Sequence, residues 1–291
     1  MCGQPERGLT RIAILAHLGR MAQHAWKHAT TYLRNMQRSS TTLLFSTLCS
    51  AIFAQHSELM QNTMSQATAA TEEVVIHPVH HSALALEWKG HTILVDPHNG
   101  AERFKQFASP VVILITDIHE DHMDPATLGA LDLSITRIVA PRSVVDALPI
   151  EVSKHCTVLA NGERAEIAGI GIEAVPMYNM PDPNDPRHPK GRGNGYVITL
   201  GEERIYISGD TEDIPEMRAL KNIDMAFVCM NLPYTMTVDQ AASGVLAFKP
   251  RVVYPYHYRG KDGLSDVARF KQLVHAGDPT IEVRLEDWYA P

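Results

Sequence analysis

The sequence predicts an α/β domain over residues 74–291, in which helices cover two β-sheets. From residue 74 onward, short runs of strand-forming residues alternate with turn signals, and segments of helical pattern lie between the later runs. Residues 111–115 form a continuous apolar run, which is typical of a strand buried on both faces. Strands and helices therefore alternate along one domain.

The strands are expected in order along this domain. Residues 83–88 and 92–96 flank Lys89-Gly90, a pattern typical of a hairpin. Gly201-Glu202-Glu203 has the composition of a second hairpin turn. Beyond residues 111–115, the expected strands cover residues 137–140, 172–176, 195–200, 204–208, 225–229, 252–255 and 281–285.

Five helices are expected, and two of them carry start signals. Thr237 and Gln240 have the spacing of a capping box, which satisfies backbone N–H groups at a helix start. Asp266 is expected in the first turn of the last helix, where the helix dipole favours a negative charge. The helices cover about residues 126–132, 143–148, 213–220, 238–248 and 265–275.

The composition excludes several classes of protein. Of the 291 residues, 45% are hydrophobic and 20% are charged, a balance that excludes a mostly disordered or collagen-like chain. The net charge of -7 argues against a nucleic-acid-binding protein, so no nucleic acid partner is expected. Four cysteines without a CxxC pair are too few for a disulfide scaffold and exclude a zinc ribbon.

Charge is distributed unevenly between the start of the chain and the rest. Residues 1–54 hold six basic residues and one acidic residue, whereas residues 55–291 hold 20 basic and 32 acidic residues. Residues 43–54 form a largely apolar run that follows basic residues. We therefore expect a leader at residues 1–54 that contains a signal peptide at 36–54, translated from Met36.

The same segment bears on localisation. The apolar run is shorter than the ~20 residues of a membrane-spanning helix, so no transmembrane anchor is expected. Residues 55–73 are small and polar and predict a linker. Cleavage after Ala54 implies an exported protein, periplasmic or secreted. The alternative is that the apolar run is a buried or interfacial helix of a cytoplasmic protein.

A dense group of metal-binding residue types follows the apolar strand at residues 111–115. Asp117, His119, Asp121 and His122 lie within six residues. Imidazole and carboxylate together suit zinc, manganese or iron. Asp121 and His122 are adjacent, so only a loop can turn both towards one point. Taken alone, this pattern also fits a solvated surface loop.

Two later segments repeat the arrangement of a strand followed by a candidate ligand. Asp210 follows the strand expected at 204–208, and His257 follows the strand expected at 252–255. In isolation, Asp210 fits an ordinary Gly-Asp turn and His257 fits a packed core histidine. The three segments together predict one metal site at the ends of the strands.

The order and spacing of these motifs resemble the metallo-β-lactamase superfamily of metal-dependent hydrolases. The resemblance covers residues 74–291, and it is strongest to the branch of ascorbate-6-phosphate lactonase-like and N-acyl-phosphatidylethanolamine phospholipase D-like proteins. It implies a four-layer αββα sandwich with one or two divalent ions at one edge. The motifs that carry it are His119-x-Asp121-His122, Gly209-Asp210-Thr211, Ile93-Leu-Val-Asp96-Pro97 and His257.

The resemblance also implies two groups of metal ligands that share Asp210. One ion would be held by Asp121, His122, Asp210 and His257. The other ion would be held by His119, by the residue at position 117, by Asp210 and by a third histidine.

Two positions depart from the family pattern. Asp117 stands where the first histidine of the motif is usual. Asn179, a poor metal ligand, stands near the place of the third histidine, and His188 is the candidate that replaces it. Because Asp117 adds one negative charge to the ligands, manganese or iron becomes plausible beside zinc, the first expectation.

The implied reaction is metal-assisted hydrolysis, in which a metal-bound hydroxide attacks an ester, lactone or phosphodiester. Asp121 would bind metal and orient the nucleophile, and His119 would bind metal or carry a proton. Asp124 and His81 are candidates to orient the imidazoles from behind. The two departures also leave open a metal-binding sensor or interaction module without turnover.

A small anionic substrate is the expected partner. Basic residues flank two of the candidate ligands, and a local basic rim on an acidic protein would favour a phosphate or carboxylate group. The alternative is that these side chains only solvate loops. The residues are Arg187, Lys190, Arg192, Arg259 and Lys261.

Overall fold

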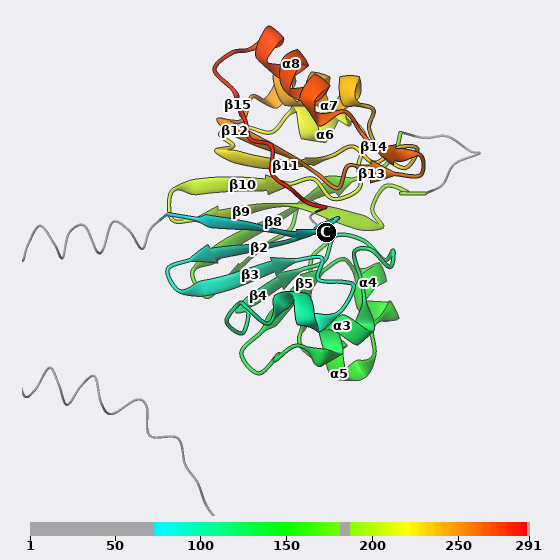
Figure 1. Ribbon diagram of the computed structural model, residues 1–291. Helices are drawn as coiled ribbons and strands as arrows, with labels where there is room; N and C mark the ends of the chain where they lie inside the picture. Colours follow the sequence, from blue (N-terminus) through cyan, green and yellow to red (C-terminus); the bar gives the residue numbers. More distant parts are fainter. Residues whose placement is uncertain (1–72, 181–186, 290–291) are drawn as a thin grey trace, which may run out of the picture. The chain divides into compact units, whose positions relative to one another are not determined.

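The computed structural model describes residues 73–180 and 187–289, in which two β-sheets lie between two layers of helices (Figure 1). This arrangement confirms the predicted αββα fold class. The expected leader at 1–54 lies outside the described residues, as does the expected linker at 55–73 apart from residue 73. Within the described residues, no helix has the length and apolar character needed to cross a membrane.

The first sheet has the strand order β1-β2-β3-β4-β5-β6. Neighbours from β1 to β3 are antiparallel, whereas neighbours from β3 to β6 are parallel. The strands are β1 (Val75–His80), β2 (Ala83–Trp88), β3 (His91–Val95), β4 (Val112–Leu114), β5 (Arg137–Ala140) and β6 (Cys156–Val158).

The second sheet has the order β15-β12-β11-β10-β9-β8-β7. Neighbours from β10 to β15 are parallel, and β7 to β10 form antiparallel hairpins. The strands are β7 (Arg164–Ile167), β8 (Ile170–Met177), β9 (Gly193–Leu200), β10 (Glu203–Ile207), β11 (Met225–Cys229), β12 (Val252–Tyr256) and β15 (Glu282–Val283). A short ribbon of β13 (Arg259–Gly260) and β14 (Gly263–Leu264) follows β12.

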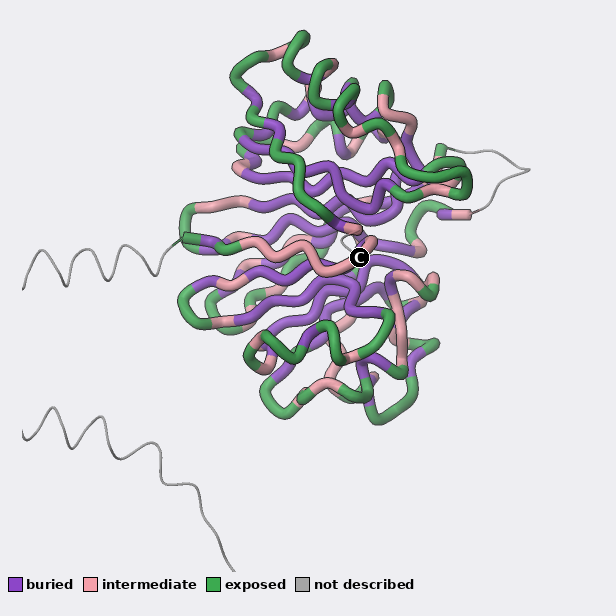
Figure 2. Tube along the Cα trace, viewed as in Figure 1, coloured by how far each residue is buried: buried purple, intermediate pink, exposed green. Residues whose placement is uncertain are grey.

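Helices cover the outer face of each sheet. The first sheet packs against η1 (Ala101–Phe104), α3 (Pro125–Ala130), α4 (Arg142–Ala147) and α5 (Ile150–Ser153), and the second against α6 (Pro215–Arg218), α7 (Val238–Phe248) and α8 (Val267–Gly277) (Figure 1). The strands are largely buried, and exposed residues concentrate on the helices and turns (Figure 2).

Alternation along the strands of the first sheet builds two cores. Successive side chains of a strand point to opposite faces. In β2, Leu84 and Leu86 join the core between the sheets, whereas Ala83 and Ala85 join the core under the helices. Burial on both faces explains why β4 has no polar residue and why its continuous apolar run predicted a strand.

The expected elements are present with shifted ends. α7 has the predicted bounds, and Thr237 and Gln240 form the predicted capping box. Asp266 is the N-cap of α8 rather than a residue of its first turn, so that expectation is wrong by one position. The helix expected at 213–220 is reduced to α6, because Pro215 restricts the preceding backbone to extended conformations and fixes the helix start.

Several short elements were not predicted from the sequence. β1 mixes histidine and proline with aliphatic residues and has no buried residue, so it lacks the alternation of a half-buried strand. β6 and β7 have only three and four residues, and none of them is fully buried. Their strand conformation depends on pairing with a neighbour rather than on local pattern.

Candidate metal centre

The candidate site lies where strands of both sheets end. Asp96 follows β3, residues 116–122 follow β4, Asp210 follows β10 and His257 follows β12. β3 and β4 are parallel neighbours, as are β10, β11 and β12, so the carboxyl ends of each set lie at one edge. Loops at this edge carry the functional side chains, as is usual in parallel sheets.

Four of the predicted ligands converge, and we call them the His122 group: Asp121, His122, Asp210 and His257. His257 Nε2 lies 3.1 Å from Asp210 Oδ1 and 3.6 Å from Asp121 Oδ2. His122 Nε2 lies 3.4 Å from Asp210 Oδ2 and 3.8 Å from Asp121 Oδ1. Three segments that are distant in the sequence therefore meet at one point, while the binding of an ion there remains a prediction.

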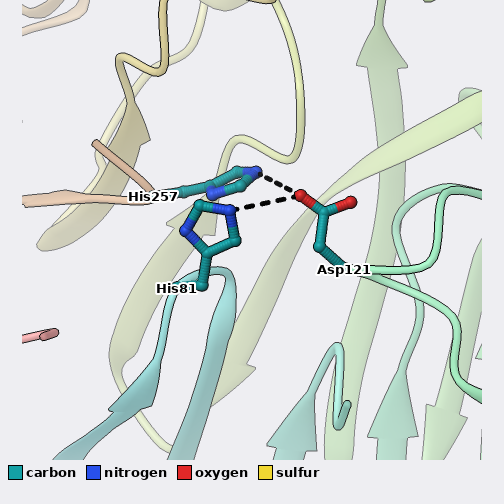
Figure 3. A group of neighbouring side chains, drawn as sticks. All are labelled: His81, Asp121 and His257. Carbon is teal, nitrogen blue, oxygen red and sulfur yellow. Dashed lines mark ion pairs between the residues drawn. The ribbon is translucent and has the colours of Figure 1, made fainter. Parts of the chain in front are cut away.

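His81 joins this group from the turn between β1 and β2 (Figure 3). Its Nε2 lies 3.3 Å from Asp121 Oδ2. Its ring is perpendicular to the His257 ring, with the two ring centroids 4.0 Å apart. Its Nδ1 hydrogen-bonds with the Tyr289 hydroxyl at 2.8 Å. The sequence suggested only an orienting role for His81, yet its ring nitrogen is close enough to Asp121 and His257 to share an ion with them.

The remaining predicted ligands form a second cluster, the Asp117 group, which consists of Asp117, His119 and His188. His119 Nδ1 lies 2.9 Å from Asp117 Oδ2, and His188 Nε2 lies 3.9 Å from the same oxygen. His188 Nε2 is also 3.2 Å from Asp210 Oδ2. Asp210 is thus in contact with both groups, as the resemblance implied.

His188, rather than Asn179, points towards Asp210. The Asn179 amide nitrogen donates to Glu212 Oε1 at 3.2 Å and to the Tyr234 carbonyl at 2.9 Å. These two acceptors fix the amide so that Asn179 Oδ1 accepts a hydrogen bond from His188 Nδ1. The lone pair of His188 Nε2 is therefore directed into the centre, and Asn179 acts by orienting the ring.

Asp96 orients His122 from behind. Asp96 Oδ2 lies 2.8 Å from His122 Nδ1, and its two oxygens also accept hydrogen bonds from Thr116, at 2.8 Å from the backbone N–H and 2.6 Å from the hydroxyl. A carboxylate behind a metal-binding imidazole fixes the ring and its tautomer. Asp124, which the sequence suggested for this role, instead caps α3 by accepting from two backbone N–H groups.

The buried charges of the centre shift one another's pKa values. Burial alone would raise the pKa of Asp210, but the charges of His257 and His122 hold it well below its usual value. Burial alone would lower the pKa of His122, but Asp210, Asp121 and Asp96 raise it well above its usual value. A cation bound here would compete with the proton on His122.

Besides His257 Nδ1, three buried side-chain atoms of the centre have no hydrogen-bond partner of good geometry: His122 Nε2, His188 Nε2 and Asp210 Oδ1. Leaving a buried polar atom unpaired costs ~1–3 kcal/mol, and one or two shared cations would satisfy all three. Imidazole and carboxylate ligands in these numbers suit zinc, manganese or iron. The residues present therefore fit a divalent metal centre.

A cavity of about 580 Å³ opens onto both groups, a size that accommodates a small molecule. Of the five basic residues expected at its rim, Arg187, Arg259 and Lys261 line it. Lys190 and Arg192 do not, because Lys190 pairs with Glu216 at 2.6 Å and Arg192 pairs with Asp117.

The cavity also contains a polar residue that sequence reasoning missed. Asn231, at the end of β11, lines the wall, and its amide nitrogen is 3.2 Å from His257 Nε2. Asn231 lies two residues after the buried parallel strand β11. Asp210 and His257 were predicted from similar positions after strands, so the same signal could have identified Asn231.

Comparisons with known proteins support the fold described above. Residues 75–257 match the profile of the β-lactamase superfamily domain. A UPF0173 metal-dependent hydrolase from Pyrococcus horikoshii is 31% identical over 192 residues, which cover 62% of this chain and 84% of that protein. Solved structures are also similar to this chain, and two of them serve as examples.

The first comes from Parabacteroides distasonis and is assigned as a metal-dependent hydrolase. It is 40% identical, with a TM-score of 0.66 over 74% of this chain and 93% of that chain. The second, Igni18, is a metallo hydrolase from Ignicoccus hospitalis. At 23% identity and a TM-score of 0.62, over 74% of this chain and 95% of that chain, it supports the fold alone.

Proposed function

This chain belongs to the metallo-β-lactamase superfamily of metal-dependent hydrolases, and from that premise we propose that it hydrolyses a small anionic ester, lactone or phosphodiester. The observation that carries this proposal is the convergence of the His122 and Asp117 groups on Asp210, at the wall of an open cavity. We propose one or two divalent ions there, with zinc as the first choice and manganese or iron as alternatives.

The chemistry divides between the ions and the side chains. When bound, divalent ions supply a Lewis acid and a water whose pKa falls to ~7. His122, His188, His257 and Asp210 are nearly or completely buried and serve to hold the ions. Asp121 and His119 have side chains that are 38% and 41% exposed, so they are the members of the two groups most open to a substrate.

Asp121 is suited to hold the attacking water. Although burial opposes it, the charge of His122 and the hydrogen bond from His81 keep the pKa of Asp121 well below its usual value in the metal-free chain. A bound cation would replace the charge of His122, so the carboxylate would stay ionised and could accept a hydrogen bond from water on the cavity side. We propose that His119, which lines the same cavity, contacts the ion of the Asp117 group or carries a proton to the leaving group.

The preference for an anion is supported by the cations of the cavity wall. Arg259 stacks on Tyr289 at 4.1 Å, and among the described residues neither Arg259 nor Lys261 forms an ion pair with a carboxylate. Most other basic side chains near the site are paired, such as Lys190 with Glu216. Two cations without carboxylate partners beside a metal centre favour a phosphate or carboxylate on the substrate.

Turnover by the full chain tests this proposal. The assay compares an activated phosphodiester, a lactone and two esters that share a leaving group but differ in the charge of the acyl part, with and without prior removal of metal. We expect metal-dependent turnover, and Lys261→Met should raise KM about tenfold for the anionic ester only. Lys271→Met, on the exposed face of α8, is the matched control.

Two results would contradict the proposal. Turnover that survives complete removal of metal would exclude the metal-dependent chemistry. Equal changes in KM for the charged and the uncharged ester would exclude recognition of an anion by Lys261.

We also propose that the protein is exported. Support comes from the basic, acid-poor residues 1–54 and the apolar run at 43–54. N-terminal sequencing of protein recovered outside the cytoplasm should give a chain that begins at Gln55. Recovery of the uncleaved chain in the cytoplasm alone would rule out export.

A further inference from the structure

We propose that Arg192 is a counter-charge that makes Asp117 equivalent in charge to the neutral histidine that is usual at this position. Arg192 Nε donates to Asp117 Oδ1 at 3.1 Å, and Nη2 donates to Asp117 Oδ2 at 2.8 Å. This two-pronged contact fixes the plane of the carboxylate as well as its charge. The inference rests on the proposed metal centre and concerns the Asp117 group alone.

The pair is part of the architecture and not a chance contact of a surface arginine. Asp117 is completely buried, and the Arg192 side chain is only 20% exposed. The backbone of Arg192 is held on both sides: its N–H donates to the Pro189 carbonyl at 3.2 Å, and its carbonyl accepts from the Ser143 hydroxyl at 2.7 Å.

The residues after Arg192 bring it against the loop that carries Asp117. The Asn194 N–H donates to the Thr116 carbonyl at 2.9 Å, which ties the start of β9 to the residue before Asp117. Gly193 makes this approach possible, because a Cβ there would lie 2.9 Å from the same carbonyl oxygen. The backbone of these residues therefore holds position 192 beside Asp117.

The Asp117–Arg192 pair changes the net charge that the sequence predicted for the centre. Asp117 alone makes the ligands one unit more negative than usual, and this difference was the reason to consider manganese or iron. Carboxylate and guanidinium together are neutral, as an imidazole is. With Arg192 included, the centre has the same net charge as one with histidine at position 117 and no arginine behind it.

The contact leaves the carboxylate directed at the other members of its group. Asp117 Oδ2 is 2.9 Å from His119 Nδ1 and 3.9 Å from His188 Nε2, both of which are on the side of Asp210. Arg192 Nη2 also lies 3.3 Å from His119 Nε2, so Arg192 contacts two members of the group. It acts through them, as a positioning residue rather than a catalytic one.

Exchange of the charges tests the inference, with metal content per chain as the readout. In Asp117→His, a guanidinium without its carboxylate lies beside an ion site, so one of the two ions should be lost or bound at least ~100-fold more weakly. Adding Arg192→Met should restore two ions. Adding Arg192→Lys, which is of similar size to methionine but charged, should not. Zinc content after dialysis gives the number of bound ions, and competition with a chromogenic chelator gives their affinity.

Further variants separate charge from folding. Asp117→His with Arg259→Met is the matched control, because Arg259 lines the same cavity but does not contact Asp117; it should not restore the ion. If the histidine variants do not fold, Arg192→Met and Arg192→Lys in the native chain suffice. The methionine variant should bind the ion of the Asp117 group at least ~10-fold more tightly, because its carboxylate has no counter-charge.

The outcomes distinguish this inference from the proposed function. Equal metal content after Arg192→Met and after Arg192→Lys in the Asp117→His chain, or equal ion affinity of the two variants in the native chain, would overturn the role of Arg192. Two ions in the native chain would still support the hydrolase. A single ion in the native chain that is retained in Asp117→Ala would also overturn the inference alone. A native chain that binds no divalent ion would refute the proposed function itself.

Discussion

The His122 group and the Asp117 group, the two halves of the candidate centre, support their proposed ligands in opposite ways. Behind His122 stands the Asp96 carboxylate, which accepts a hydrogen bond, and behind Asp117 stands the Arg192 guanidinium, which donates two. One backing group adds negative charge to its half, and the other removes it. The contrast shows that the types of the ligands do not by themselves set the charge of a metal centre, because the group behind each ligand contributes as much.

The largest effect is expected at the residue that both halves share. Asp210→Ala removes the carboxylate in contact with His122, His188 and His257, so both ions and at least ~1,000-fold of the activity should be lost. Metal analysis and circular dichroism check that the loss is local. Asp239→Asn, an exposed carboxylate paired with Arg269, should change neither. Full metal occupancy in Asp210→Ala would remove the basis for comparing two halves.

The His122 half alone should respond to a change at Asp96. Asp96→Asn removes the negative charge behind His122 and leaves one oxygen to serve both the Thr116 N–H and His122 Nδ1. Loss of such a partner typically weakens metal affinity by ~10–100-fold. Titration with zinc should then show one weakened site and one unchanged site. Weakening of both sites to the same extent would show that the halves are not independent.

The corresponding change in the Asp117 half should have a smaller effect. Asn179→Ala frees His188 Nδ1, but the ring remains buried and packed, so we expect about tenfold weaker binding of one ion. Calorimetric titration of Asn179→Ala and Asp96→Asn with zinc measures the affinity of each ion in both variants. If the two variants weaken the same ion, the assignment of Asn179 to the Asp117 half is incorrect.

The last prediction concerns stability rather than metal binding, and it involves pH and His98, whose Nδ1 bonds to the Asp96 carbonyl in the His122 half. Burial, the main cause, lowers the pKa of His98 to about 4, whereas the unfolded chain has the usual value near ~6.5. The unfolded state therefore takes up a proton first. The stability that His98 contributes is fully present above pH ~6.5 and is lost as the pH falls towards 4, by ~3 kcal/mol at most.

Urea unfolding of the metal-free protein at several pH values measures this effect. His98→Gln should flatten the decline of stability between pH ~6.5 and 4 relative to the native chain. An unchanged slope would mean that His98 is already protonated in the folded state, contrary to its buried environment.

Much of the site was predictable because it depends on local pattern. The continuous apolar run of β4 and the apolar strands before Asp210 and His257 placed these residues at strand ends, where parallel neighbours bring them together. The roles of His81 and Asp124 were less accessible. Asp124 has the sequence position of a helix cap, which the structure shows it to be, and His81 depends on how the β1–β2 turn lies against Asp121.

The sequence by itself determined the fold class, the types of the candidate ligands and their order along the chain, because hydrophobic period and strand ends are local properties. Only the tertiary structure decided what stands behind each ligand. Arg192 is 75 residues from Asp117, and Asp96 is 26 residues from His122. Such partners are chosen by which strands lie side by side, and the charge of the centre is therefore a property of the packed fold.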